Sequence, residues 1–257
     1  MKKLIFSLVL ISECAVAFQG FETPSSAVLA HGYVGLGAEG GYFKSKNLFD
    51  IALDGHVIVA PVIFVKAGFG NRLEAEITWD VYRYVTSDSQ FGSTGDVSDP
   101  SFFVKLNVLR QAQWPGLSVQ LGAKEPATSN ESHVGTDEAD IFASLLLGKT
   151  LCKVDMHARL GIGIYGDRNI LASQEDAFLY GFLISKKIND RLQLGLEYAG
   201  QFYKSDHALN RMGMKGGLEF LLAQSWYVHG TVGVGFIEQS EAWGLLVGFA
   251  YRDKMFQ

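Results

Sequence analysis

The chain is poor in cysteine and proline, and after its first residues it has no long apolar run. Its 257 residues include 2 cysteines and 5 prolines. Beyond the N-terminal segment only Cys152 remains, so we expect no disulfide within the mature chain. No stretch of about 18 apolar residues follows the N-terminus, which argues against a transmembrane helix.

The chain also lacks a basic excess, since its formal net charge is −5. A protein that binds nucleic acid is expected to carry a basic face, so we expect no nucleic-acid partner. There is no phosphate loop, no dinucleotide fingerprint and no Cys/His cluster. His133, His157 and His229 do not show the spacing of a metal site. We therefore expect neither a cofactor nor a metal.

The first residues have the pattern of an export signal. Lys2 and Lys3 precede a short apolar run at 4–11, and the small residues at 15–17 suit signal peptidase. We predict a cleaved signal peptide at 1–17 and one domain at 18–257. Cleavage would take the formal charge from −5 to −6, because two lysines and one glutamate leave.

What the sequence has in abundance is two-residue periodicity and glycine, of which there are 29. In residues 153–165 apolar side chains such as Met156 and Leu160 alternate with polar ones such as His157 and Arg159. Successive side chains of a strand face opposite sides, so this segment is predicted to have one apolar and one polar face. A tilted strand needs roughly 9 to 11 residues to cross a membrane.

The same alternation recurs along the whole chain. It predicts strands near 31–43, 50–66, 72–84, 98–109, 117–125, 139–149, 153–165, 177–187, 191–203, 211–222, 226–237 and 241–251. The predicted fold is all-β, a transmembrane antiparallel up-and-down β-barrel of about 12 strands. Closure is required because a sheet in lipid can leave no edge unpaired. The alternative is a soluble secreted barrel whose apolar face forms an internal core.

The connections between the predicted strands alternate in length. Short turns are predicted at 68–71, 150–152, 188–190 and 223–225, and longer loops at 86–96, 126–138, 166–175 and 204–210. Outer-membrane barrels have this layout, with short periplasmic turns and long external loops. The first and last connections, 44–47 and 238–240, are predicted to be short. Aromatic residues near strand ends are predicted to form interfacial girdles, namely Trp79, Tyr82, Tyr84, Tyr165, Tyr198, Tyr203, Trp226, Tyr227, Trp243 and Tyr251.

The central third resembles a known family of outer-membrane transporters, the MetA-pathway phenol-degradation family. The resemblance runs through Gly95-Asp96-Val97 into Phe102-Phe103-Val104-Lys105, and then through Leu121-Gly122-Ala123-Lys124-Glu125-Pro126-Ala127-Thr128. It continues at Gly135-Thr136 and at Tyr165-Gly166-Asp167. The family usually has Lys-x-Pro-Thr-Gly, from which Ala127-Thr128-Ser129 departs. The resemblance implies a barrel with a transport role, and the family offers no established catalytic residues to carry over to this sequence.

If the apolar face meets lipid, the charged face lines the lumen. The predicted pore-lining residues are Asp155, His157, Arg159, Glu74, Glu76, Asp80, Lys105, Lys124, Glu197, Arg191, Lys215 and Glu219. These charges either set the selectivity of a pore or pair across strands and fill the interior. Of these residues, Asp155, His157 and Arg159 are predicted to form part of the constriction.

The sequence thus favours a non-enzymatic outer-membrane channel or transporter for small molecules. The expected partners are outer-membrane lipid, small solutes and the barrel-assembly machinery, whose recognition signal the segment 243–251 resembles. One alternative is a structural or surface-interaction barrel with a filled lumen. A less favoured one is a lipid hydrolase, for which Ser129, Ser132 and His133 supply suitable side chains in one loop.

Overall fold

A computed structural model describes residues 21–45, 55–87, 93–128, 138–166, 175–203, 210–237 and 240–256. The predicted signal peptide, 1–17, lies outside these residues. The strands are β1 (Tyr33–Ser45), β2 (Gly55–Phe69), β3 (Leu73–Asp80), β4 (Arg83–Ser87), β5 (Ser93–Asp96), β6 (Ser101–Leu109), β7 (Gly116–Lys124), β8 (Asp140–Leu151), β9 (Val154–Tyr165), β10 (Glu175–Lys187), β11 (Leu192–Tyr203), β12 (Arg211–Ala223), β13 (Trp226–Gly235) and β14 (Glu241–Lys254).

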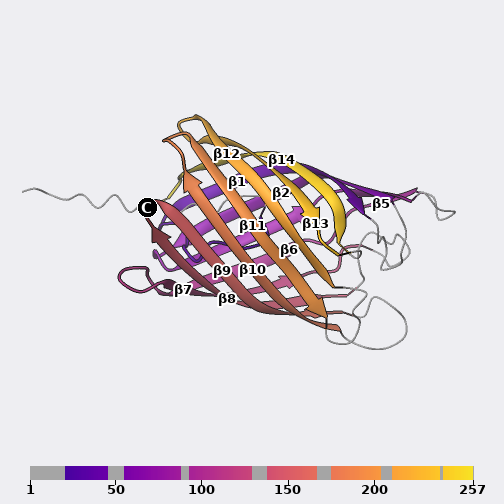
Figure 1. Cartoon of the computed structure of the whole chain (residues 1–257), viewed down its shortest axis with the longest axis horizontal. Helices are drawn as coiled ribbons and strands as arrows, with labels where there is room; N and C mark the ends of the chain where they lie inside the picture. Colours follow the sequence, from indigo (N-terminus) through magenta and orange to yellow (C-terminus); the bar gives the residue numbers. More distant parts are fainter. Residues whose placement is uncertain are drawn as a thin grey trace, which may run out of the picture.

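These strands form one closed antiparallel barrel (Figure 1). From β6 to β14 each strand pairs with the next one in the chain, and β1 closes the barrel by pairing with both β14 and β2. Between β2 and β6 the pairs are β2 with β3 and β4, β3 with β6, and β4 with β5. Over the described residues the barrel has twelve strands, because β3 with β4 and β5 with β6 each follow one continuous path. The predicted all-β fold of twelve strands is confirmed.

The interruption between β3 and β4 lies opposite Pro61 of β2. β3 pairs with the second half of β2 and β4 with the first half. Proline has no amide hydrogen to donate to a sheet, so the regular ladder cannot pass through it. The chain instead bridges the gap with Val81 N–H donating to Pro61 O at 2.8 Å and Ala60 N–H donating to Tyr82 O at 3.0 Å. The wall therefore stays closed at this point.

The apolar faces of the strands point outward. In β8, Leu145 and Leu147 are exposed while Ser144 and Leu146 are buried, and in β9 Leu160 and Ile162 are exposed while His157 is buried. Large exposed apolar side chains occur on most of the strands, from Leu36 of β1 to Phe249 of β14. The alternative of a soluble barrel with an apolar core is therefore wrong, because the apolar set covers the outside of this closed barrel.

The two ends of the barrel differ. At the end that we call the turn end, connections such as 152–153 and 224–225 are tight, and β1 begins where β14 ends. At the opposite loop end the longer connections lie. The first connection was predicted at 44–47, and part of this range lies outside the described residues, which end at 45 and resume at 55. No helix in the described part of the chain is long and apolar enough to cross a membrane.

Candidate functional site: the barrel lumen

The inner wall is charged, and most of its charges are paired. Lys105 lies directly across from Glu74 in the β3–β6 pair, with Nζ 2.8 Å from Oε1. Lys66 and Glu76 face one another between β2 and β3 at 3.0 Å. Opposite charges at facing positions of an antiparallel pair attract, and in a buried setting each one needs such a partner.

A second group of pairs reaches further along or across the wall. Lys124 of β7 contacts Asp140 of β8 at 2.7 Å and also Asp99 at 3.4 Å. Arg252 of β14 donates two hydrogen bonds to Glu219 of β12, at 2.9 and 2.6 Å, across the intervening strand β13. On the lumen side the first contact joins the adjacent strands β7 and β8, and the pair of Arg252 with Glu219 joins β14 to β12 across β13.

Three of the other predicted residues, Asp80, Asp155 and Arg191, lie near an interruption of the wall or near a turn. Asp80 accepts a hydrogen bond from Arg83 at 2.6 Å, near the interruption between β3 and β4. Asp155 accepts one from Thr150 at 2.6 Å, close to the turn between β8 and β9. Arg191 lies in the turn before β11 and is exposed, so it is not brought together with the luminal charges.

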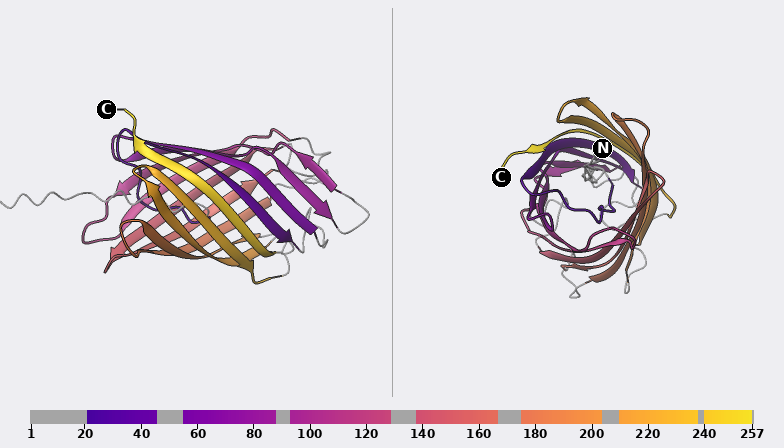
Figure 2. Two further views of the ribbon diagram at one scale, coloured as in Figure 1. Left: turned by 90° about the horizontal axis from the view of Figure 1, so that it is seen from above. Right: turned by 90° about the vertical axis from the view of Figure 1, so that its left-hand side faces the viewer.

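Residues 21–29, which we call the luminal segment, run along the inside of the barrel before β1 begins. In the end-on view of Figure 2 this part of the chain, in indigo, follows the inner wall. It has no regular secondary structure. Its backbone groups cannot pair within a sheet, and buried backbone groups need other partners. The side chains of the inner wall provide them.

The first half of the luminal segment is held by β9, β11 and β12. Glu197 accepts hydrogen bonds from the backbone N–H groups of Glu22 and Thr23. Arg159 donates to the backbone carbonyl of Glu22 at 3.2 Å. The carboxylate of Glu22 in turn contacts the ammonium group of Lys215 at 2.6 Å. The positive charge of Lys215 holds the pKa of the Glu22 carboxyl below its ordinary value, so this contact is between full charges.

The second half is held by β9 and then by β7, β6 and β3. Ser26 N–H donates to His157 Nδ1 at 3.4 Å, and the Ser26 carbonyl accepts hydrogen bonds from Asn107 and Ser118. Further along, Leu29 N–H donates to Glu74 at 2.8 Å. Six of the residues predicted to line the pore therefore hold this segment: Glu74, Lys105, His157, Arg159, Glu197 and Lys215.

Four glycines of the wall make room for the segment, and at one of them, Gly68 of β2, an added Cβ would collide with the backbone carbonyl of Leu29. A Cβ added at Gly217 of β12 would lie 3.1 Å from the ring of Phe21. One added at Gly181 of β10 or at Gly148 of β8 would collide with the hydroxyl oxygen of Thr23 or of Ser26. Glycine permits these close approaches because it has no side chain.

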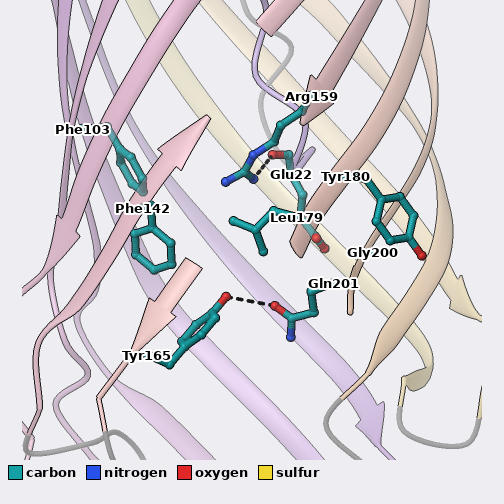
Figure 3. A pocket seen from close by; sticks show the side chains of 9 residues that line it. All are labelled: Glu22, Phe103, Phe142, Arg159, Tyr165, Leu179, Tyr180, Gly200 and Gln201. Carbon is teal, nitrogen blue, oxygen red and sulfur yellow. Dashed lines mark hydrogen bonds between the residues drawn. The ribbon is translucent and has the colours of Figure 1, made fainter. Parts of the chain in front are cut away.

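A cavity of about 240 Å³ lies beside the luminal segment, on the side of the loop end. Its lining residues, which Figure 3 shows, are Glu22, Phe103, Phe142, Arg159, Tyr165, Leu179, Tyr180, Gly200 and Gln201. Glu22 and Arg159 bound it toward the segment, and the hydroxyl of Tyr165 donates to Gln201 at 3.0 Å. Towards the loop end, Tyr165 and Leu179 pack with Tyr203 in a buried apolar cluster.

The girdle prediction is wrong for part of the aromatic set. Tyr165 and Tyr203 are buried inside the barrel, and Tyr227 lies under the guanidinium of Arg252 at 4.5 Å from its ring centre. Trp226 and Trp243, by contrast, are exposed and contact Tyr251 and Tyr42. Alternation already placed Tyr165 on the polar face of its strand, and this signal could have identified it as luminal.

The serine and histidine side chains considered for hydrolysis, Ser129, Ser132 and His133, lie outside the described residues. Among the residues that the structure does describe, no group of three His, Cys, Asp or Glu side chains could hold a metal ion. The described part of the lumen thus contains ion pairs, a bound segment of the chain and a cavity.

Comparison with known proteins gives a likeness of fold. No protein-family model matches the sequence, and no curated protein matches it. An outer membrane channel from Pseudomonas putida F1 is 11% identical, with a TM-score of 0.68 over 89% of this chain and 98% of that chain. The NanC porin is 9% identical, with a TM-score of 0.60 over 84% of this chain and 98% of its own. The KdgM porin is 8% identical, with a TM-score of 0.51 over 85% and 98%. The chain therefore has the transmembrane barrel fold of outer-membrane channels and porins.

Proposed function

We propose that the protein is a channel that lets small molecules cross the outer membrane. The observation that carries this proposal is the division of the wall, with apolar side chains outside and charged side chains inside a closed barrel. Such a barrel meets lipid on its outer face and offers a polar path through its interior. A non-enzymatic role is part of the proposal.

The comparisons support the proposal at the level of fold. The similar structures include a protein described as an outer membrane channel and two described as porins. We propose in addition that the chain is a distant member of the phenol-degradation family of outer-membrane transporters, on the basis of the motifs at 95–105 and 121–128. Export by the signal peptide at 1–17 and insertion by the barrel-assembly machinery belong to the same proposal.

The luminal segment determines how wide such a channel is. It occupies part of the interior and is held by strands on opposite sides of the barrel, from Lys215 of β12 to Glu74 of β3. A narrow passage with a small conductance is therefore expected. The predicted residues His157 and Arg159 remain proposed constriction residues, because both contact this segment. Asp155 is proposed to act at the turn end, where its carboxylate lies near the turn between β8 and β9.

The test is single-channel conductance of the refolded protein in a planar bilayer, after a gel shift on heating has shown that the barrel is folded. We expect small discrete open steps for the wild type. Deletion of residues 21–29 is expected to raise the conductance several-fold, because the passage then has the full width of the barrel. A folded barrel that stays silent in both forms would contradict the channel and favour the filled structural barrel.

A hydrolase remains the less favoured alternative. Ser132→Ala would abolish phospholipid release if this residue were the nucleophile. A wild-type protein that releases no phospholipid in detergent would eliminate the alternative.

A further inference from the structure

The cavity beside the luminal segment has two chemically different sides. One side is aromatic and is formed by three rings from three strands, Phe103 of β6, Phe142 of β8 and Tyr165 of β9. The other end is the guanidinium group of Arg159 (Figure 3). A ligand that fits both would need a flat apolar body and a negative charge.

The aromatic side is a continuous surface. The ring centres of Phe103 and Phe142 are 6.0 Å apart, and those of Phe142 and Tyr165 are 5.7 Å apart. Two glycines allow the rings to lie along the wall, because a Cβ at Gly122 would collide with Phe103 and one at Gly163 would lie 2.7 Å from Tyr165. Aromatic rings at these separations offer edges and faces on which a further ring can pack.

Among the residues that the structure describes, Arg159 forms no ion pair. Its Nε donates to the hydroxyl of Ser144 at 3.1 Å and its NH1 to the carbonyl of Glu22 at 3.2 Å, and both acceptors are neutral. Within the described part of the chain no carboxylate lies within 4.0 Å of this guanidinium. The neighbouring carboxylate of Glu22 is held by Lys215 at 2.6 Å.

This distinguishes Arg159 from the other cations on the inner wall. Lys66, Lys105, Lys124, Lys215 and Arg252 each have a carboxylate within 3.0 Å. A guanidinium has five donors in a planar fork that matches a carboxylate, and a half-buried one gains most from such a partner. The missing partner at Arg159 is what an anionic ligand would supply.

We propose that this cavity binds a small aromatic carboxylate, with its carboxylate group at Arg159 and its ring against Phe103, Phe142 and Tyr165. Ligand pockets of drug-sized molecules begin at roughly 300 Å³, so a cavity of about 240 Å³ fits a molecule with one ring or two fused rings. The inference rests on the proposed channel function, since it names a class of solute that would pause on its way through the lumen.

The test is isothermal titration calorimetry on the folded barrel in lipid nanodiscs, with benzoate, benzamide and acetate as ligands. Benzoate is expected to bind, whereas benzamide lacks the charge and acetate lacks the ring, and both are expected to bind more weakly. Arg159→Gln is expected to lower the affinity for benzoate at least about tenfold, the effect of losing a hydrogen bond between charged groups. Arg159→Lys keeps the charge without the planar fork and is expected to lose less.

The matched control is Lys66→Gln, which removes a luminal cation from the opposite side of the barrel, where it is paired with Glu76. It should leave the affinity for benzoate unchanged. Equal binding of benzoate and benzamide, equal losses in Arg159→Gln and Lys66→Gln, or no benzoate binding by the wild type would each overturn the proposal. Binding is measured without transport, so a barrel that binds benzoate and does not conduct would refute only the channel.

Discussion

Two sides of the barrel satisfy their internal charges in different ways. On the side of β12, β13, β14 and β1, which we call the paired wall, charged or polar side chains contact one another across a strand, apart from Lys215 of β12, which binds Glu22 of the luminal segment. Glu39 of β1 lies 3.0 Å from His229 of β13, and Arg252 of β14 binds Glu219 of β12. On the side of β8 to β11, the cavity wall, Arg159 and Glu197 contact the backbone of the luminal segment instead.

The geometry of the paired wall follows from a small residue between the partners. Gly248 of β14 lies between Glu39 and His229, and a Cβ there would be 2.7 Å from atoms of each. The two side chains can therefore meet over the strand that separates them. On the cavity wall the corresponding space holds the segment and the cavity. The charges of the paired wall join strands of the barrel to one another. Those of the cavity wall contact the luminal segment instead, and a solute could take the place of these contacts if the segment moved.

The largest effect is expected on the paired wall. Arg252→Met leaves the buried carboxylate of Glu219 without its partner, and breaking a buried pair in this way costs about 3–5 kcal/mol. The free energy of unfolding, measured by urea titration in lipid vesicles, should fall by this amount. Arg211→Met is the control, because the side chains of Arg211 and Glu241 are 40% and 43% exposed and such pairs contribute about 1 kcal/mol or less. Similar losses in both variants would contradict the distinction between buried and exposed pairs.

An intermediate effect, confined to the luminal segment, is expected on the cavity wall. Glu197→Gln replaces a charged acceptor of the Glu22 and Thr23 N–H groups by a neutral one. The loss of charge-assisted hydrogen bonds is expected to cost about 1.5 kcal/mol, and amide hydrogen exchange at residues 22 and 23 should accelerate about tenfold. Exchange within the strands should not change, because the segment opens locally.

The control for this prediction is Gln193→Ala on the same strand. Gln193 donates to Ser185 near the turn end and has no hydrogen bond with the segment. Acceleration at residues 22 and 23 in this variant as well would show that β11 as a whole, and not the contact at Glu197, holds the segment.

The sequence predicted the outward, apolar face of each strand better than it predicted what occupies the lumen. Two-residue alternation is a local property, so it identified the twelve strands and the outward apolar side chains such as Leu145 and Leu160. The luminal segment does not show the two-residue alternation of apolar and polar side chains, and its partners lie far away in the chain. Leu29 and Glu74 are separated by 45 positions and Glu22 and Glu197 by 175, so no local pattern connects them.

The cavity was missed for a related reason. Alternation places Phe103, Phe142 and Tyr165 on the inner face of their strands, but it does not give the register between strands, which decides whether the rings meet. The bounds predicted for the second strand, 50–66, lie partly outside the described residues, which resume at Gly55.

The smallest effect is expected at the loop end of the cavity wall. Tyr165→Phe removes the hydroxyl that donates to Gln201 at 3.0 Å and keeps the ring that packs against Phe142 and Tyr203. A single neutral hydrogen bond contributes about 1 kcal/mol to the free energy of unfolding. A double-mutant cycle with Gln201→Leu isolates this contribution, since each single variant removes the same contact. A coupling energy near zero would mean that the packing of the aromatic rings alone fixes this end of the cavity. The cavity wall would then be held in place by those rings and by the luminal segment, without a contribution from this hydrogen bond.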